Sequence, residues 1–175
     1  MVDSEGVMKK PDKVKAILNM DKPYNISSLR RFLGMANQLM KFCPNLAEKT
    51  RPLRDMLKKG NDWIWGKPQD NAFDELKTEL SSNRILALYN PERETIVSAD
   101  ASSFGLGAVI MQKQSSGGIR PVAYASRSMT NTECRYAQIE KEALAITWAL
   151  ERWSDLVVGM KFTVETDHKP LVLLF

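Results

Sequence analysis

The first half of the chain carries apolar residues at the three- and four-residue spacing of amphipathic helices. This pattern predicts four helices, at residues 11–20, 27–42, roughly 46–58 and from Pro68 to Leu80. Ser27 is a candidate N-cap of the second helix, and Pro52 is expected to kink the third. Trp63 and Trp65, in the loop before the fourth, are interpreted as buried anchors rather than as base-stacking aromatics.

From Pro91 onward the pattern changes to short alternating runs, which predict strands. The predicted strands cover residues 94–100, 105–112, 119–129 and 161–167. Thr130 and Glu133 have the spacing of a capping box and are expected to start a long helix between the last two strands. The buried stripe predicted for that helix is Ile139, Ala143, Ile146, Leu150 and Trp153.

The connections between these elements predict the fold class. Three strands joined by short turns should pair antiparallel, and the long helix lets the fourth strand return parallel to a neighbour. We therefore expect an α/β chain in which a small helical segment precedes a mixed sheet.

Basic residues are concentrated in the helical half. Between Lys9 and Lys59 there are 13 Lys and Arg against 4 Asp and Glu, whereas the part from Pro91 to Phe175 has 9 against 10. This asymmetry is equally consistent with a surface that binds nucleic-acid phosphates and with an ordinary solvated basic surface. The candidate phosphate-binding residues are Arg30, Arg31, Lys41, Lys49, Arg51, Arg54, Lys58 and Lys59.

Composition limits the class of protein. With 43% hydrophobic and 26% charged residues, and no apolar run of membrane length, the chain should fold as a globular protein without a membrane partner. The first residues show no pattern of a signal peptide, and the two cysteines, Cys43 and Cys134, lie far apart. We expect a cytoplasmic or nuclear protein that is not secreted.

Three acidic residues occupy positions that suit a metal site. Asp100 ends the first predicted strand, Asp167 ends the fourth, and Glu142 lies on the apolar side of the intervening helix. Mg²⁺ and Mn²⁺ prefer carboxylate oxygens, and a bound ion offsets the repulsion between neighbouring carboxylates. Taken singly, each acid is more readily explained as an ordinary surface carboxylate, so it is the arrangement of all three that motivates the hypothesis.

At these residues the sequence resembles a known family. The segments SADASSFGLGAVIMQ, PVAYASRSM, ECRYAQIEKEALAI and VETDHKPL are similar, in this order, to the RNase H domain of gypsy-class LTR retrotransposon reverse transcriptase polyproteins. Upstream, PDKVKAI, LRRFLGMAN and FDELKTEL resemble the thumb and the segment that joins it to RNase H. The resemblance implies a thumb-like helical segment at 1–62, a connecting helix at 63–90 and an RNase H-like domain at 91–175.

The resemblance also implies an activity, namely hydrolysis of the RNA strand of RNA–DNA hybrids with two Mg²⁺ or Mn²⁺ ions. The implied metal ligands are Asp100, Glu142 and Asp167, with Glu140 the less suitable alternative to Glu142. Ser126 and Arg127 are implied contacts to the hybrid backbone.

The family has a further ligand downstream, whereas this sequence ends at Phe175 and lacks the polymerase palm. We therefore expect an RNase H-like domain that is incomplete at its C-terminus and weak or inactive alone. The rest of the reverse transcriptase, its palm and fingers, would be a partner on the parent polyprotein. The alternative function is that of a catalytically inactive remnant that binds duplex nucleic acid.

Overall fold

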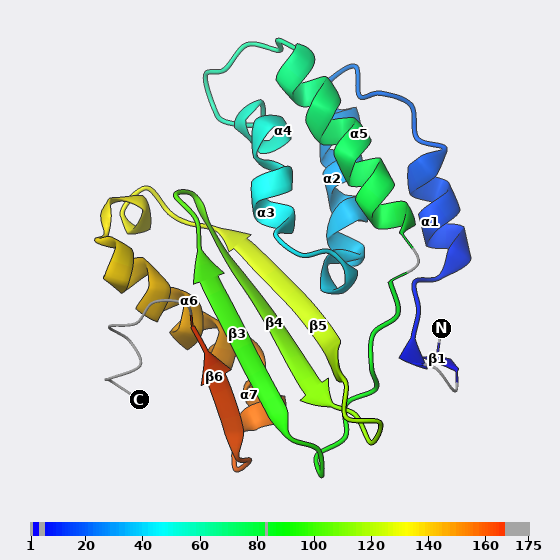
Figure 1. Cartoon of the computed structure of the whole chain (residues 1–175). Coiled ribbons are helices and arrows are strands. Elements are labelled where there is room, and N and C mark those ends of the chain that lie inside the picture. Colours follow the sequence, from blue (N-terminus) through cyan, green and yellow to red (C-terminus); the bar gives the residue numbers. More distant parts are fainter. Residues whose placement is uncertain (1, 4–5, 83, 167–175) are drawn as a thin grey trace.

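The computed structural model describes residues 2–3, 6–82 and 84–166, and it consists of a helical unit packed against one face of a four-stranded sheet (Figure 1). A short hairpin of β1 (Val2–Asp3) and β2 (Gly6–Val7) comes first, and the backbone of Val7 pairs with that of Leu86. The helical elements that follow are α1 (Pro11–Leu18), α2 (Ile26–Gln38), the 3-10 turn η1 (Met40–Phe42), α3 (Leu46–Lys49), α4 (Arg51–Asp55) and α5 (Lys67–Ser81).

Helix α2 begins one residue before the predicted cap. Asn25, not Ser27, is the N-cap: its side chain accepts a hydrogen bond of 2.8 Å from the backbone N–H of Ser28. Ser28 returns the interaction, since its hydroxyl accepts from the Asn25 N–H at 3.1 Å. The predicted cap, Ser27, takes no part in this capping box, in which Asn25 is the cap and Ser28 supplies the second half of the pair.

The predicted helix over residues 46–58 is two short helices, α3 and α4, that meet at Thr50. Pro52 has no N–H to donate to the carbonyl of Glu48, so the helix restarts instead of merely kinking. Thr50 is buried at the junction, and its hydroxyl donates to the Leu46 carbonyl at 2.7 Å.

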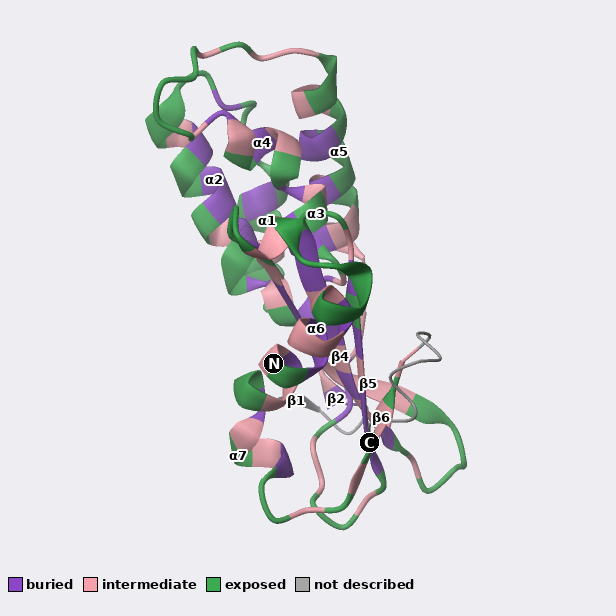
Figure 2. Cartoon of the chain, turned by 90° about the vertical axis from the view of Figure 1, so that its left-hand side faces the viewer, coloured by how far each residue is buried: buried purple, intermediate pink, exposed green. Residues whose placement is uncertain are grey.

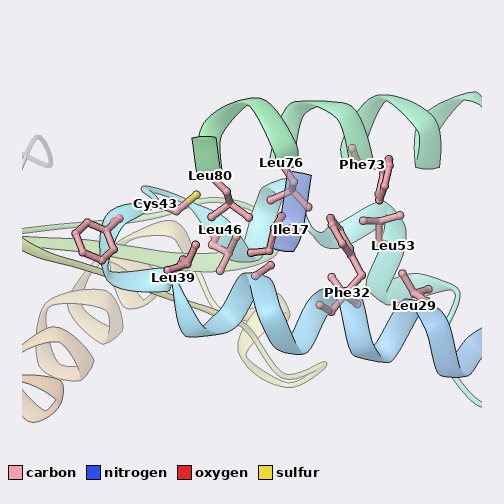
Figure 3. Packing of buried hydrophobic residues seen from close by; sticks show 14 of the residues in the cluster. Ile17, Leu29, Phe32, Leu39, Cys43, Leu46, Leu53, Phe73, Leu76 and Leu80 are labelled. Atoms are coloured by element: carbon pink, nitrogen blue, oxygen red, sulfur yellow. The ribbon is translucent and has the colours of Figure 1, made fainter. Parts of the chain in front are cut away.

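The core of the helical unit lies between α2 and α5, with α1 and α4 closing its sides (Figure 3). At the centre of this core, the ring centroids of Phe32 and Phe73 are 4.7 Å apart. Helix α5, which lies in the segment interpreted as a connector, thus packs as a full member of this unit. Trp63 and Trp65 lie against the same core, and the Trp65 indole donates to Asp70 at 2.7 Å.

The sheet has the predicted topology. Its strands are β3 (Thr95–Ala101), β4 (Gly105–Lys113), β5 (Ile119–Ser128) and β6 (Phe162–Glu165), in the order β5-β4-β3-β6. The β3–β4 and β4–β5 pairs are antiparallel, and β6 joins β3 in parallel. The 3-10 turn η2 (Glu133–Arg135) and the helices α6 (Gln138–Arg152) and α7 (Ser154–Val157) connect β5 to β6.

Helix α6 differs from its prediction in both start and orientation. The reciprocal Thr130–Glu133 hydrogen bonds form, but they lie at the turn that leads into η2, and α6 starts only after the extended residues Tyr136 and Ala137. Ile139, which the predicted stripe placed inside, is 39% exposed. The buried face consists of Glu142, Ala145, Ile146, Ala149 and, just past the helix, Trp153. Small alanines on this face allow the helix to lie close to the sheet.

The two faces of the sheet are covered by different parts of the chain (Figures 1 and 2). Helix α6 packs on Val97, Ala99 and Ala101 of β3, whereas α3 and η1 of the helical unit lie over β4 and β5. Arg51 stacks on Phe104 across that second interface, with its guanidinium carbon 3.1 Å from the ring centroid. Among the described residues, every helix is too short or too polar to cross a bilayer.

Candidate metal and nucleic-acid site

Asp100 lies one residue before the end of β3, opposite Gly107 of β4. Because side chains alternate along a strand and Ala99 and Ala101 face α6, Asp100 points to the other face, where it is exposed. There it lines a small hollow together with Asn45 and Glu48 of the helical unit. The hollow is narrow because Asn45 lies over Gly107: a methyl group at residue 107 would be 2.5 Å from the Asn45 Oδ1.

Glu142 approaches the same strand end from the opposite face. Glu142 is only 3% exposed, although it carries a carboxylate. It shares the buried face of α6 with Ala145 and Ile146. Gln138, one helical turn earlier, donates from its Nε2 to the Glu142 Oε1 and to the carbonyl of Ala101 at 3.2 Å. Since Ala101 directly follows Asp100, this side chain connects Glu142 to the strand end that carries Asp100.

The third predicted ligand, Asp167, lies outside the described residues, just beyond β6. Within the part of the chain that the structure describes, no group of three or more His, Cys, Asp or Glu side chains is arranged to hold a metal ion. The donor chemistry of Asp100 and Glu142 nevertheless fits hard divalent cations, which take carboxylate oxygens. A complete set of ligands would need Asp167 beside these two.

The predicted phosphate-binding residues fall into two groups. Arg30, Arg31, Lys41 and Lys59 are exposed, as are Arg54 and Lys58, which contact Thr50 and Asp55 respectively. Lys49 is only partly exposed, and Arg51 is exposed but, like Lys49, has close partners within the protein. The Lys49 ammonium is 3.0 Å from Glu79 and 3.7 Å from Glu75, and Arg51 stacks on Phe104 at the interface between the helical unit and the sheet.

Ser126 and Arg127 also have partners within the chain. The buried Ser126 hydroxyl accepts a 3.0 Å hydrogen bond from the Ala47 N–H of α3. The Arg127 guanidinium donates two hydrogen bonds to the Glu133 carboxylate in a bidentate arrangement, with N–O distances of 2.8 and 2.9 Å. The hydrogen bonds from Arg127, followed by that from the Thr130 N–H, lower the pKa of Glu133 to about 2. Both side chains therefore hold the fold together around the strand ends.

Two residues of this region were not singled out from the sequence. Gln138 had a local signal, because a polar side chain four residues before Glu142 lies on the same helical face. Asn45 had no signal in the sequence. Its place over Gly107 depends on its left-handed backbone conformation, with φ of 52°, and on docking of the helical unit on the sheet.

Comparison with known proteins agrees with the motifs. A family model described as the RNase H-like domain found in reverse transcriptase matches residues 65–164. The chain is 34% identical, over 98% of its length, to the retrovirus-related Pol polyproteins of the Drosophila melanogaster transposons 297 and 412. It is 31% identical to the transposon Tf2-3 polyprotein of Schizosaccharomyces pombe, again over 98% of its length. It spans only 16%, 14% and 13% of these three polyproteins.

Solved structures show the same relationship. The foamy viral protease-reverse transcriptase dRH in complex with ds DNA superposes with a TM-score of 0.80 at 25% identity, over 98% of this chain and 31% of that one. The foamy viral protease-reverse transcriptase in complex with RNA/DNA hybrid gives 0.78 at 25% identity, over 97% of this chain and 24% of that one. This chain therefore belongs to the family of RNase H-like domains found in reverse transcriptases.

Proposed function

We propose that this chain is the part of a transposon reverse transcriptase that holds an RNA–DNA hybrid and hydrolyses its RNA strand with divalent metal ions. The observation that carries the proposal is the placement of two carboxylates at the same end of β3. Asp100 lies on the strand itself, and the buried Glu142 lies on α6, where its partner Gln138 also donates to the carbonyl of Ala101. A buried glutamate on the sheet-facing side of a helix is costly for stability, which favours a functional role.

Asp100, Glu142 and Asp167 would hold the Mg²⁺ or Mn²⁺ ions. When bound, such ions supply the Lewis acid that polarises a phosphodiester and lowers the pKa of an attacking water. The residues of the chain contribute negative charge and orientation. Asp100 is accessible from solvent on the strand face that a substrate could approach, whereas Glu142 is kept in place by the apolar residues around it and by Gln138.

The proposed substrate is duplex nucleic acid, because the structural relatives were solved in complexes with ds DNA and with RNA/DNA hybrid. The exposed cations of the helical unit would contact phosphates, which gives affinity without reading the base sequence. Lys49 and Arg51 should contribute least, since Lys49 is only partly exposed and is paired with Glu79, and the Arg51 guanidinium is stacked on Phe104. The palm and fingers of the enzyme would come from the rest of the polyprotein.

A second candidate function is duplex binding without chemistry. It is favoured by one observation: many exposed cations of the helical unit could contact phosphates whether or not metal ions bind. The two functions share the binding surface and differ only in whether metal ions bind at the end of β3.

Binding is tested by measuring the affinity for a hybrid duplex across a series of salt concentrations. The double variant Arg30→Glu/Arg31→Glu should weaken binding and reduce the slope of log affinity against log salt, by roughly 0.9 for each phosphate that the variant no longer neutralises. Lys113→Glu is the matched control, because Lys113 lies on the sheet and is paired with Glu94 at 3.5 Å. An affinity that does not respond to salt would contradict the binding surface.

Chemistry is tested separately with the Asp100→Asn variant. In the full-length reverse transcriptase, this variant should bind the hybrid as well as the unchanged enzyme does while losing Mn²⁺-dependent cleavage. Normal hybrid binding together with no Asp100-dependent cleavage, in the full-length reverse transcriptase, would favour the second candidate function.

A further inference from the structure

We infer that Gln138 is a positioning residue that sets the orientation of the Glu142 carboxylate toward the metal site. The inference rests on the proposed function, because it concerns how one of the proposed ligands is held. Gln138 would not touch the ion or the substrate in this role, and it would act through Glu142 alone.

Both N–H protons of the Gln138 side-chain amide have an acceptor. Gln138 Nε2 donates one N–H to the Glu142 Oε1 and the other to the Ala101 carbonyl, at 3.2 Å. The first acceptor is the proposed ligand, and the second is the last residue of β3, directly after Asp100. A single planar amide therefore fixes the carboxylate of Glu142 relative to the strand that carries the other ligand.

A hydrogen bond fixes the start of α6, and this restrains the backbone from which the Gln138 amide extends. The Glu140 carboxylate accepts a 2.8 Å hydrogen bond from the Ala137 N–H, which satisfies one of the free donors at the beginning of the helix. Gln138 is the first residue of α6, and Glu142 follows four residues later on the same helical face.

This arrangement matters because a carboxylate ligand must present its oxygens in one orientation for a metal ion to bind tightly. A glutamate side chain has three rotatable bonds, and a hydrogen bond to one oxygen removes most of the freedom that remains near the carboxylate. Hydrogen-bond partners of metal ligands typically change metal affinity by about 10- to 100-fold when they are replaced. If Gln138 only joined α6 to β3, its replacement would lower the stability of the fold but would not change the affinity for the metal ion.

The test replaces the amide while keeping the length of the side chain. Gln138→Met should lower the affinity for Mn²⁺, measured by calorimetry on the folded chain, by about 10- to 100-fold. Gln38→Met is the matched control, since Gln38 lies at the end of α2 and its amide oxygen accepts from Lys13. Thermal unfolding of both variants confirms that the measured chains are folded. An Mn²⁺ affinity of Gln138→Met equal to that of the unchanged chain overturns the inference.

A second measurement needs no metal and separates this inference from the proposed function. The side-chain amide protons of Gln138 are followed by NMR in the unchanged chain and in Glu142→Ala. Loss of the Glu142 acceptor should move one of the two amide proton signals upfield. If the unchanged chain binds no Mn²⁺, the proposed metal chemistry fails and positioning of a ligand fails with it, while the NMR shift still shows that the Gln138–Glu142 contact exists. Amide signals that do not respond to Glu142→Ala overturn the inference regardless of metal binding.

Discussion

Replacing Ser126 by alanine should destabilise the protein through the interface between the helical unit and the sheet. The Ser126 hydroxyl accepts a 3.0 Å hydrogen bond from the N–H of Ala47, the second residue of α3. Ser126 and Ala47 are 8% and 7% exposed, so water does not readily replace the missing acceptor. The N–H groups of a first helical turn have no partner within the helix, and α3 is only four residues long.

The expected loss of stability follows from this burial. Leaving a buried N–H without its acceptor costs about 1–3 kcal/mol. For a chain of this size each kcal/mol lowers the melting temperature by roughly 2–4 °C. Urea unfolding of Ser126→Ala should therefore show an earlier midpoint with an unchanged slope. Ser128→Ala, at the exposed end of the same strand, is the control and should stay within about 0.5 kcal/mol of the unchanged chain. A Ser126→Ala variant as stable as this control would refute the reasoning.

Three further predictions concern stability. Gly34→Ala should stabilise the chain by about 0.5–1 kcal/mol in urea unfolding, because Gly34 lies within α2 and a methyl group there meets no atom within 4 Å; any loss of stability would contradict this. Phe32→Ala should cost about 3–5 kcal/mol, since Phe32 is fully buried against Phe73, and a loss below about 1 kcal/mol would show that the core is not packed as described. The pKa of Glu133, lowered from 4.5 to about 2, contributes stability that is present above pH 4.5 and is lost as the pH falls toward 2. Glu133→Gln should therefore be less stable than the unchanged chain at pH 6, by about 1 kcal/mol given solvent screening, and the difference should vanish near pH 2.

The topology of the sheet was predictable because it depends on local patterns and short connections. Turns of a few residues at 102–104 and 114–118 allow only antiparallel pairing of β3, β4 and β5, and the length of α6 allows the parallel return of β6. Helix boundaries were less predictable where a break depends on a single backbone group. Pro52 divides α3 from α4 because of one missing N–H, an effect that apolar periodicity does not record.

The candidate site was predictable in part. Asp100 and Glu142 occupy the expected strand end and the expected helical face, whereas Asp167 lies outside the described residues. The internal partners of Ser126 and Lys49 could not be read from the sequence, because Ala47 lies 79 residues from Ser126 and Glu79 lies 30 residues from Lys49. Such contacts arise only when the chain has folded into the helical unit and that unit has docked on the sheet.

The central claim is that Asp100 and Glu142 bind divalent metal ions at the end of β3. Paramagnetic Mn²⁺, added in substoichiometric amounts to isotope-labelled protein, tests it directly by broadening the NMR signals of nearby residues. We predict that the backbone signals of Ala101, Ser102 and Gln138 broaden first, and that Asp100→Asn and Glu142→Gln each reduce this broadening. Broadening that begins elsewhere, or that is unchanged in both variants, would contradict the claim.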